Sequence, residues 1–286
     1  MTTQPAAGAD RIAAIDPETM RRLMLHEGRI HAVPGRELRD LGDAILLRDP
    51  VESEPFWNRL ECLRWPSDAH GFDRRLTETL ILFASLGRQA HIWATPLFDD
   101  PPDLVERLEA NGFVDVGKGD LMALADTEPS LTTAGIALPD GVTVERHHRL
   151  TGRGASAITR AIVDVLVDAF EVGGARHAAM EAETAASLAH PWFTHYLVRL
   201  DGRPAAVTRR ATFDGASYLS SIGTAGWARR RGLGALVTRL ATADSLALGS
   251  EWTYLGVFAD NPGAASIYRQ AGYVRVGQSC PDLLLM

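Results

Sequence analysis

A short, basic and glycine-punctuated segment at residues 229–234 constrains the fold more than any other part of the sequence. The apolar run at 218–224 before it predicts a strand, and the leucine-rich pattern at 233–246 after it predicts a helix. The first turn of a helix has backbone N–H groups without intrahelical partners and carries the positive end of the helix dipole. Glycines there let an anion approach the backbone, and arginines add charge and forked donors. The segment therefore predicts a cradle for a pyrophosphate group between a strand and a helix.

A second motif follows this cradle. Residues 252–258 have the pattern of a strand, and Asn261-x-x-Ala264 comes directly after them. A helical stretch that contains Tyr268 comes next and ends in a glycine–aromatic pair. The C-terminal half therefore predicts two successive strand–turn–helix units, each with glycine or asparagine at the turn.

Together, Arg229-x-x-Gly232-x-Gly234 and the block at 252–273 resemble the acyl-CoA signature and the later block of the GNAT N-acyltransferase superfamily. The resemblance covers residues 140–286. It implies an α+β fold in three layers, in which helices flank a mixed, mostly antiparallel and twisted sheet. It also implies an acetyl-CoA-dependent N-acetyltransferase, in which an amine of a small molecule or peptide attacks the thioester directly.

The resemblance also carries over to individual positions. The backbone of Ile222 and Thr224 would pair with the pantetheine arm, and Asn261 would cap a helix, bind that arm, or do both. The positions implied to bind the cofactor are Ile222, Gly223, Thr224, Arg229, Arg230, Arg231, Gly232, Leu233, Gly234, Ala235, Asn261, Ala264 and Tyr268. Tyr268 would act as general acid toward the leaving thiolate, because a phenol with a pKa near 10 is close in basicity to a thiol. The alternative interpretation of Tyr268 is a core aromatic residue.

The general base is less well defined. Many relatives in the superfamily carry a glutamate on the central strand, but this strand reads Tyr-Leu-Ser-Ser-Ile at 218–222 and has no carboxylate. A water relay through Ser220 or Ser221 is one alternative. A base from elsewhere is the other, and the candidates are Glu171, Glu181, His190 and His195.

The N-terminal half contains a weak echo of the C-terminal block. A short strand at 91–96 precedes an aspartate–proline turn, a helical stretch, Asn111-Gly112-Phe113 and a predicted β-hairpin at 114–124. This half has no Arg-x-x-Gly-x-Gly motif, and Leu108 stands where the second copy has Tyr268. The order predicts a degenerate GNAT-like repeat that does not bind acyl-CoA productively.

A segment rich in proline and glycine divides the two halves. It predicts a degenerate N-terminal domain at 1–126, a linker at 127–139 and a catalytic domain at 140–286. Residues 1–10 are small and polar, so they do not resemble a secretory signal.

Composition narrows the function classes. The net charge of −7 and the pI of about 5.7 argue against nucleic-acid binding. No stretch approaches the roughly 20 apolar residues of a membrane span, and no cysteine–histidine set has zinc spacing, so neither a membrane nor a metal is expected. Cys62 and Cys280 are expected to be reduced in a cytoplasmic protein, with a single disulfide left open. A homodimer is also left open.

Two further classes compete with the enzyme. A noncatalytic acyl-CoA-binding or scaffold protein would explain the missing strand carboxylate, although it would have no need of a phenol at Tyr268. A dinucleotide-binding Rossmann domain is disfavoured, because its Gly-x-Gly-x-x-Gly motif comes early in a βαβ unit, whereas the motif at 229–234 comes late and begins with arginine.

Overall fold

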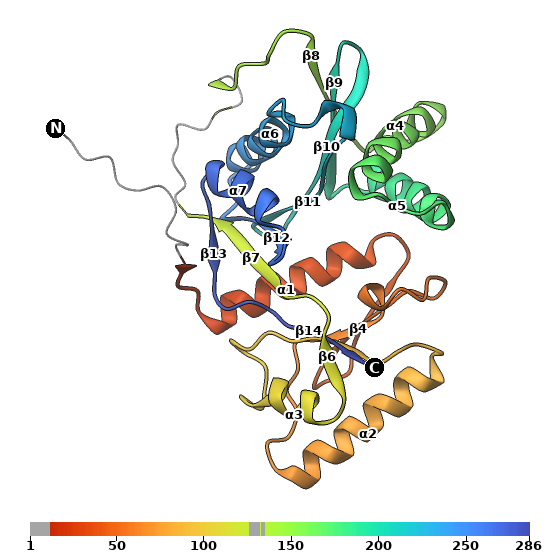
Figure 1. Ribbon diagram of the computed structural model, residues 1–286, viewed down its shortest axis with the longest axis vertical. Helices are drawn as coiled ribbons and strands as arrows, with labels where there is room; N and C mark the ends of the chain where they lie inside the picture. Colours follow the sequence, from red (N-terminus) through yellow and green to blue (C-terminus); the bar gives the residue numbers. More distant parts are fainter. Residues whose placement is uncertain (1–11, 126–131, 133–134) are drawn as a thin grey trace, which may run out of the picture.

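The computed structural model describes residues 12–125, 132 and 135–286, and within these residues the strands form two sheets (Figure 1). Residues 1–10 and most of the predicted linker at 127–139 lie outside the described residues. Most neighbouring strands in both sheets are antiparallel, and helices cover the sheets. The predicted α+β class, with a mixed and mostly antiparallel sheet, is confirmed.

The larger sheet contains the strand predicted before the cradle. Its strand order is β1 (Ile12–Ala13), β13 (Tyr273–Val276), β7 (Gly119–Leu124), β12 (Trp252–Phe258), β11 (Ala216–Thr224), β10 (Arg203–Phe213), β9 (Phe193–Leu200) and β8 (Val142–His148). β11 and β12 are parallel to each other, because the helix after the cradle makes the crossover between them.

The smaller sheet repeats the strand order of the larger one. Its strands are β2 (Glu37–Asp40), β3 (Ile45–Arg48), β4 (Arg59–Glu61), β5 (His91–Trp93), β14 (Asp282–Leu285) and β6 (Phe113–Asp115). β2, β3, β4, β5 and β6 correspond in order to β9, β10, β11, β12 and β13, and in both sheets the third and fourth of these strands are parallel. In each sheet one more strand lies between the fourth and fifth of these corresponding strands.

The additional strand comes from the opposite half of the chain. β7 precedes the predicted linker, yet it lies between β12 and β13, and the C-terminal β14 lies between β5 and β6 (Figure 1). The predicted hairpin at 114–124 is therefore wrong, since β6 and β7 belong to different sheets. The physical reason is that the connection pairs with another segment: Val116 N donates to Asp282 O at 2.8 Å and Gly119 N to Cys280 O at 2.9 Å. The segments that lead into the two exchanged strands thus run antiparallel to each other.

Helices pack against the faces of the two sheets. They are α1 (Pro17–Ala32), α2 (Ala69–Ser85), α3 (Leu104–Ala110), α4 (Arg153–Phe170), α5 (His177–Ala189), α6 (Leu233–Ala247) and α7 (Pro262–Gln270), with short 3₁₀ turns η1 (Pro55–Trp57), η3 (Gly174–Arg176) and η4 (Gly226–Ala228). α6 and α7 cover the face of the larger sheet on which Leu219 and Leu255 lie. α4 and α5 cover one part of the opposite face, and α1 packs on Tyr218 and Tyr254 in the other part. α1 therefore lies between the two sheets (Figure 1).

The exchange makes a C-terminal residue part of the N-terminal core. Leu283 of β14 is completely buried in a cluster with Leu60, Ile92 and Phe113. We expect Leu283→Ala to lower the free energy of unfolding by about 3 kcal/mol, as large-to-small changes in a core do. Chemical denaturation measures this change. The matched control is Leu248→Ala at a 62% exposed position, which should change the free energy by less than about 0.5 kcal/mol. Equal effects of the two substitutions would contradict the strand exchange.

Candidate functional site

The two central parallel strands separate where the predicted site residues lie. β11 and β12 pair only from Ala216 to Leu219 on one strand and from Trp252 to Leu255 on the other. Beyond these positions, the edges of 220–224 and 256–258 that face each other have no strand partner among the described residues. Such an edge offers unpaired N–H and C=O groups to an extended, amide-containing ligand. The structure places Ile222, Gly223 and Thr224 on it.

The cradle leads from this opening into α6. Gly232 is the N-cap of α6 and has a φ of 75°, in the left-handed region that favours glycine, and no side chain caps the helix. A Cβ at Gly234 would lie 3.2 Å from Thr224 Oγ1, closer than most Cβ contacts, so a side chain at this position would require Thr224 to shift. The N–H groups of Leu233, Gly234 and Ala235 in the first turn are therefore available to an anion.

The arginines of the cradle have different surroundings. Arg229 Nη2 donates to Ala169 O at 2.8 Å, so its guanidinium fastens the cradle to the end of α4. Gly226 N donates to Asp168 Oδ2 at 2.5 Å and makes a second link to the same helix. Arg230 and Arg231 are exposed and have no ion pair with any described residue. Their charges are thus free to attract an anionic ligand.

Tyr268 and Asn261 flank the opening on the side of α7. Tyr268 is 7% exposed, and its hydroxyl has no hydrogen-bond partner among the described residues. Burial raises the pKa of this phenol to about 12, so it stays protonated at neutral pH. Asn261 Oδ1 accepts from Ala264 N at 3.0 Å, so its predicted role as a helix cap is confirmed.

The candidate bases named from the sequence lie in several different places. Ser221 has a φ of 52° at an irregularity in the pairing of β10 and β11, and Ser220 Oγ accepts from Arg209 Nε at 3.1 Å. His195 is buried against Ser187, and burial keeps its pKa well below the usual value. The remaining candidates, Glu171, Glu181 and His190, lie at the end of α4, in a groove beside α4 and at the end of α5.

A cavity of about 140 Å³ lies beside the unpaired part of β12, on the face that α1 covers. Its lining is mostly apolar and aromatic and comes from both halves: Met24, Glu27, Phe56, Trp93, Gly119, Asp120, Leu121, Tyr218, Gly256, Val257, Phe258 and Cys280. Gly256, Val257 and Phe258 line the cavity and belong to the part of β12 that has lost its pairing with β11, so the cavity lies beside the opening.

Glu27 brings into this cavity a carboxylate that the sequence motifs did not predict. Tyr218 Oη donates to Glu27 Oε1 at 3.0 Å, while Oε2 has no hydrogen-bond partner among the described residues. Burial raises the pKa of Glu27 to about 7, and the nearby Arg59 offsets only part of that effect. The only sequence signal was a glutamate on the apolar stripe of an N-terminal helix, a position that has no counterpart in the C-terminal motifs.

The unusual titration of Glu27 is directly measurable. With ¹³C-labelled glutamate side chains, we expect one carboxyl resonance to titrate near pH 7, and we expect Glu27→Gln to remove it. Glu183 is the internal comparison, because Arg209 and Arg36 hold the pKa of its carboxyl below the usual range despite burial. If every glutamate titrates below about pH 5, the assigned environment of Glu27 is wrong.

The corresponding opening in the smaller sheet is filled by the chain itself. Leu63 N donates to Asp99 Oδ1 at 2.8 Å, Asp100 N donates to Leu63 O at 3.0 Å, and Trp65 N donates to Asp100 O at 3.0 Å. The N-terminus of α2 is also occupied, because Asp68 accepts from Gly71 N at 2.8 Å. The free edge and the uncapped helix of the larger sheet have no equivalent here.

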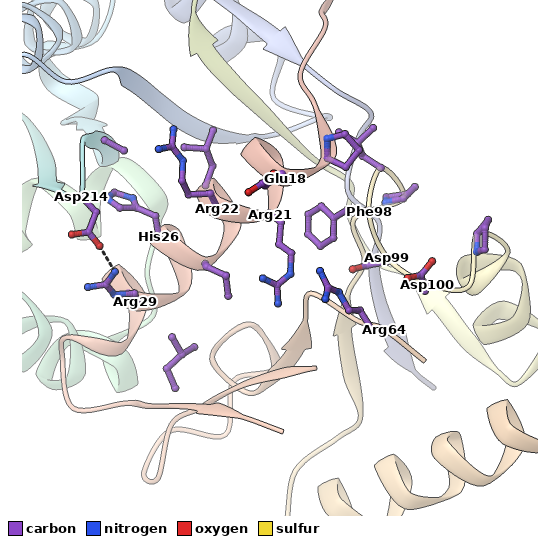
Figure 2. A pocket seen from close by; sticks show the side chains of 18 residues that line it. Glu18, Arg21, Arg22, His26, Arg29, Arg64, Phe98, Asp99, Asp100 and Asp214 are labelled. Atoms are coloured by element: carbon purple, nitrogen blue, oxygen red, sulfur yellow. Dashed lines mark hydrogen bonds and ion pairs between the residues drawn. The ribbon is translucent and has the colours of Figure 1, made fainter. Parts of the chain in front are cut away.

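A larger cavity among the described residues lies elsewhere, on the flank of α1 that faces away from Glu27. Figure 2 shows its charged lining, with Arg21, Arg22, Arg29 and Arg64 near several carboxylates. The Arg29 guanidinium pairs with Asp214. No position predicted from the sequence lines this cavity, so its size alone does not make it the candidate site.

The composition also led to expectations about membrane spans, metal sites and cysteines, and the described residues can be compared with each. Among them no helix is long and apolar enough to cross a bilayer, and no cluster of histidine, cysteine or acidic side chains is suited to hold a metal ion. Cys62 and Cys280 are buried free thiols, so no disulfide joins them.

The similarity of this chain to known proteins is found in its structure. No protein-family model matches the sequence, and no curated protein sequence matches it. A GCN5-related N-acetyltransferase from Kribbella flavida superposes with a TM-score of 0.67 at 23% identity, covering 91% of this chain and 94% of that one. The GCN5-related N-acetyltransferase from Sphaerobacter thermophilus superposes with a TM-score of 0.61 at 16% identity, covering 86% of this chain and 81% of that one. A tandem GNAT protein from the clavulanic acid biosynthesis pathway superposes with a TM-score of 0.62 at 14% identity, covering 90% of this chain and 86% of that one. At these identities the similarity concerns the fold, and it extends over both sheets.

Proposed function

We propose that this chain, which has the fold of the GCN5-related N-acetyltransferases, transfers an acetyl group from acetyl-CoA to an amine. One observation carries the proposal: the unpaired edge of β11 leads directly into the uncapped N-terminus of α6. The edge suits the amides of a pantetheine arm, and the helix terminus suits a pyrophosphate. Both lie on the C-terminal half, where the motif predicted them.

The chain's own residues supply the donor site. The first-turn N–H groups at Leu233, Gly234 and Ala235 would bind the pyrophosphate, with Arg230 and Arg231 adding positive charge. The donor, when bound, supplies an activated acyl carbon as a thioester. Tyr268 remains protonated at neutral pH and would donate to the sulfur as it leaves.

The proposal includes one donor site per chain. In the N-terminal half, Asp99 and Asp100 already pair with the strand edge, and Asp68 already occupies the helix N-terminus. A second acyl-CoA would have to displace these contacts and bind beside the Asp68 carboxylate, which repels phosphate. The degenerate half is therefore proposed to shape the acceptor side rather than to bind a donor.

Calorimetric titration with acetyl-CoA tests the donor site. We expect one site per wild-type chain, and we expect Gly234→Glu to weaken binding by at least about 100-fold, equivalent to about 2.7 kcal/mol. The substitution puts a side chain and a negative charge where the pyrophosphate would lie. Gly154→Glu is the matched control: Gly154 is exposed in the first turn of α4, and a Cβ there meets open space. Absence of binding to the wild type would overturn the proposed function, and two sites per chain would overturn its stoichiometry.

Tyr268→Phe tests whether the site is catalytic or only binds the donor. With an amine identified by a thiol-release screen, we expect kcat to fall about 100-fold while the affinity for acetyl-CoA is unchanged. Tyr273→Phe is the control: the Tyr273 hydroxyl lies in the same cluster but bonds to Thr242 Oγ1 at 2.8 Å, so its loss should leave kcat within about twofold. Donor binding without any turnover of amines would favour the noncatalytic alternative.

A further inference from the structure

We infer that the cavity beneath the parted strands is the acceptor site, that it takes a primary amine on a compact apolar or aromatic body, and that Glu27 of the N-terminal half is the base. The inference rests on the proposed function and adds the acceptor class and the proton acceptor. It starts from the position of the cavity, which is lined by Gly256, Val257 and Phe258 in the part of β12 not paired with β11 and lies on the opposite face of the sheet from Tyr268.

Size and lining define the body of the acceptor. The cavity measures about 140 Å³, and an apolar protein cavity of roughly 150 Å³ holds a benzene ring. Met24, Phe56, Trp93, Leu121 and Tyr218 present carbon surface to it. A long polar or polycationic amine would leave its charged groups without partners on such a lining.

Charge in the cavity defines the reacting group. The other acid on the lining, Asp120, accepts from Ser279 Oγ at 2.5 Å and lies 3.8 Å from Arg275, so its charge is already engaged. Glu27 Oε2 has no partner among the described residues, and the side chain of Glu27 is 9% exposed. One carboxylate oxygen without a hydrogen-bond partner, on a side chain that is largely buried, matches a single ammonium group.

The groups around Glu27 hold it in place without neutralising it. On the same helix, His31 Nε2 lies 3.9 Å from Glu27 Oε1. Burial keeps the pKa of His31 well below its usual value, so its ring is neutral. From β4, Arg59 pairs with Glu61 at 3.0 Å, so this arginine has its own carboxylate. The Glu61 carboxyl adds to the rise in the pKa of Glu27. Burial raises the pKa of Tyr218, Tyr254 and Cys280, which keeps these three neighbours uncharged.

The proposed proton path uses both faces of the sheet. Glu27 takes one proton from the ammonium, and the nitrogen lone pair forms the C–N bond to the thioester carbon. The C–S bond breaks, its electron pair passes to sulfur, and sulfur takes a proton from Tyr268. The Tyr268 phenolate recovers a proton from the second N–H of the former ammonium through water. The products are an amide, a free thiol and one proton on Glu27, which passes to solvent.

The pH profile separates a base from a structural residue. For the wild type acting on 2-phenylethylamine, we expect kcat/KM to fall about tenfold per pH unit below about 7, because protonated Glu27 cannot accept a proton. Glu27→Gln should lower kcat/KM about 100-fold at pH 7.5 and remove that limb. Tyr218→Phe should move the limb to higher pH, since the hydrogen bond from Tyr218 stabilises the carboxylate. Glu18→Gln, on the opposite flank of α1, is the matched control and should keep the wild-type profile.

The acceptor class is tested with three probes in the presence of acetyl-CoA. We expect thiol release with 2-phenylethylamine to exceed that with ethanolamine or spermidine by at least about 10-fold in kcat/KM. A preference for either polar amine, or no turnover of any probe while acetyl-CoA binds, would overturn the acceptor assignment. An unchanged pH limb in Glu27→Gln would overturn the role of Glu27. Calorimetry on the same samples keeps these results apart from failure of the donor site, because Glu27→Gln should bind acetyl-CoA as the wild type does.

Discussion

The parting of β11 and β12 is the feature on which the rest of the site depends. Two parallel strands in the middle of a sheet do not separate without cost, because each leaves backbone groups unpaired. Here β12 keeps a full ladder on its other edge, where Gly256, Val257 and Phe258 pair with Leu121, Asp120 and Gly119 of β7. The strand contributed by the N-terminal half thus supports β12 while its edge toward β11 stays open. Strand exchange and the opening between β11 and β12 are therefore two aspects of one arrangement.

The two halves have the same strand order, but the gap between the central parallel strands is closed in one half and open in the other. In the smaller sheet, the segment with Asp99 and Asp100 closes the gap after β4, and Asp68 caps the following helix. In the larger sheet the corresponding edge is free and Gly232 caps the helix without a side chain. What the N-terminal half contributes to the other side of the opening is α1, whose Glu27 meets Tyr218 across the interface.

The carboxylates at this interface differ in pKa because their neighbours differ. Glu183 lies between Arg36 and Arg209, and these two charges more than offset its burial, so its pKa is lowered. Glu61 pairs with Arg59, but burial still raises the pKa of its carboxyl. The carboxylate of Glu27 accepts a hydrogen bond only from the Tyr218 hydroxyl among the described residues. A carboxylate held between two guanidinium groups is a structural ion pair, whereas one with a pKa near neutrality is poised to exchange a proton.

By itself, the sequence determined the local units. Residues 218–234 predicted a strand, a glycine-punctuated cradle and a helix, because apolar periodicity and backbone requirements are encoded in neighbouring residues. The same holds for the cap at Asn261 and for the echo of this order in the N-terminal half. Only the tertiary structure decided that 114–124 does not form a hairpin, since β7 finds better partners in the other sheet. It also decided that Glu27 lies beside the opening, because its burial and its pKa arise from residues far away in the chain, and no local pattern records them.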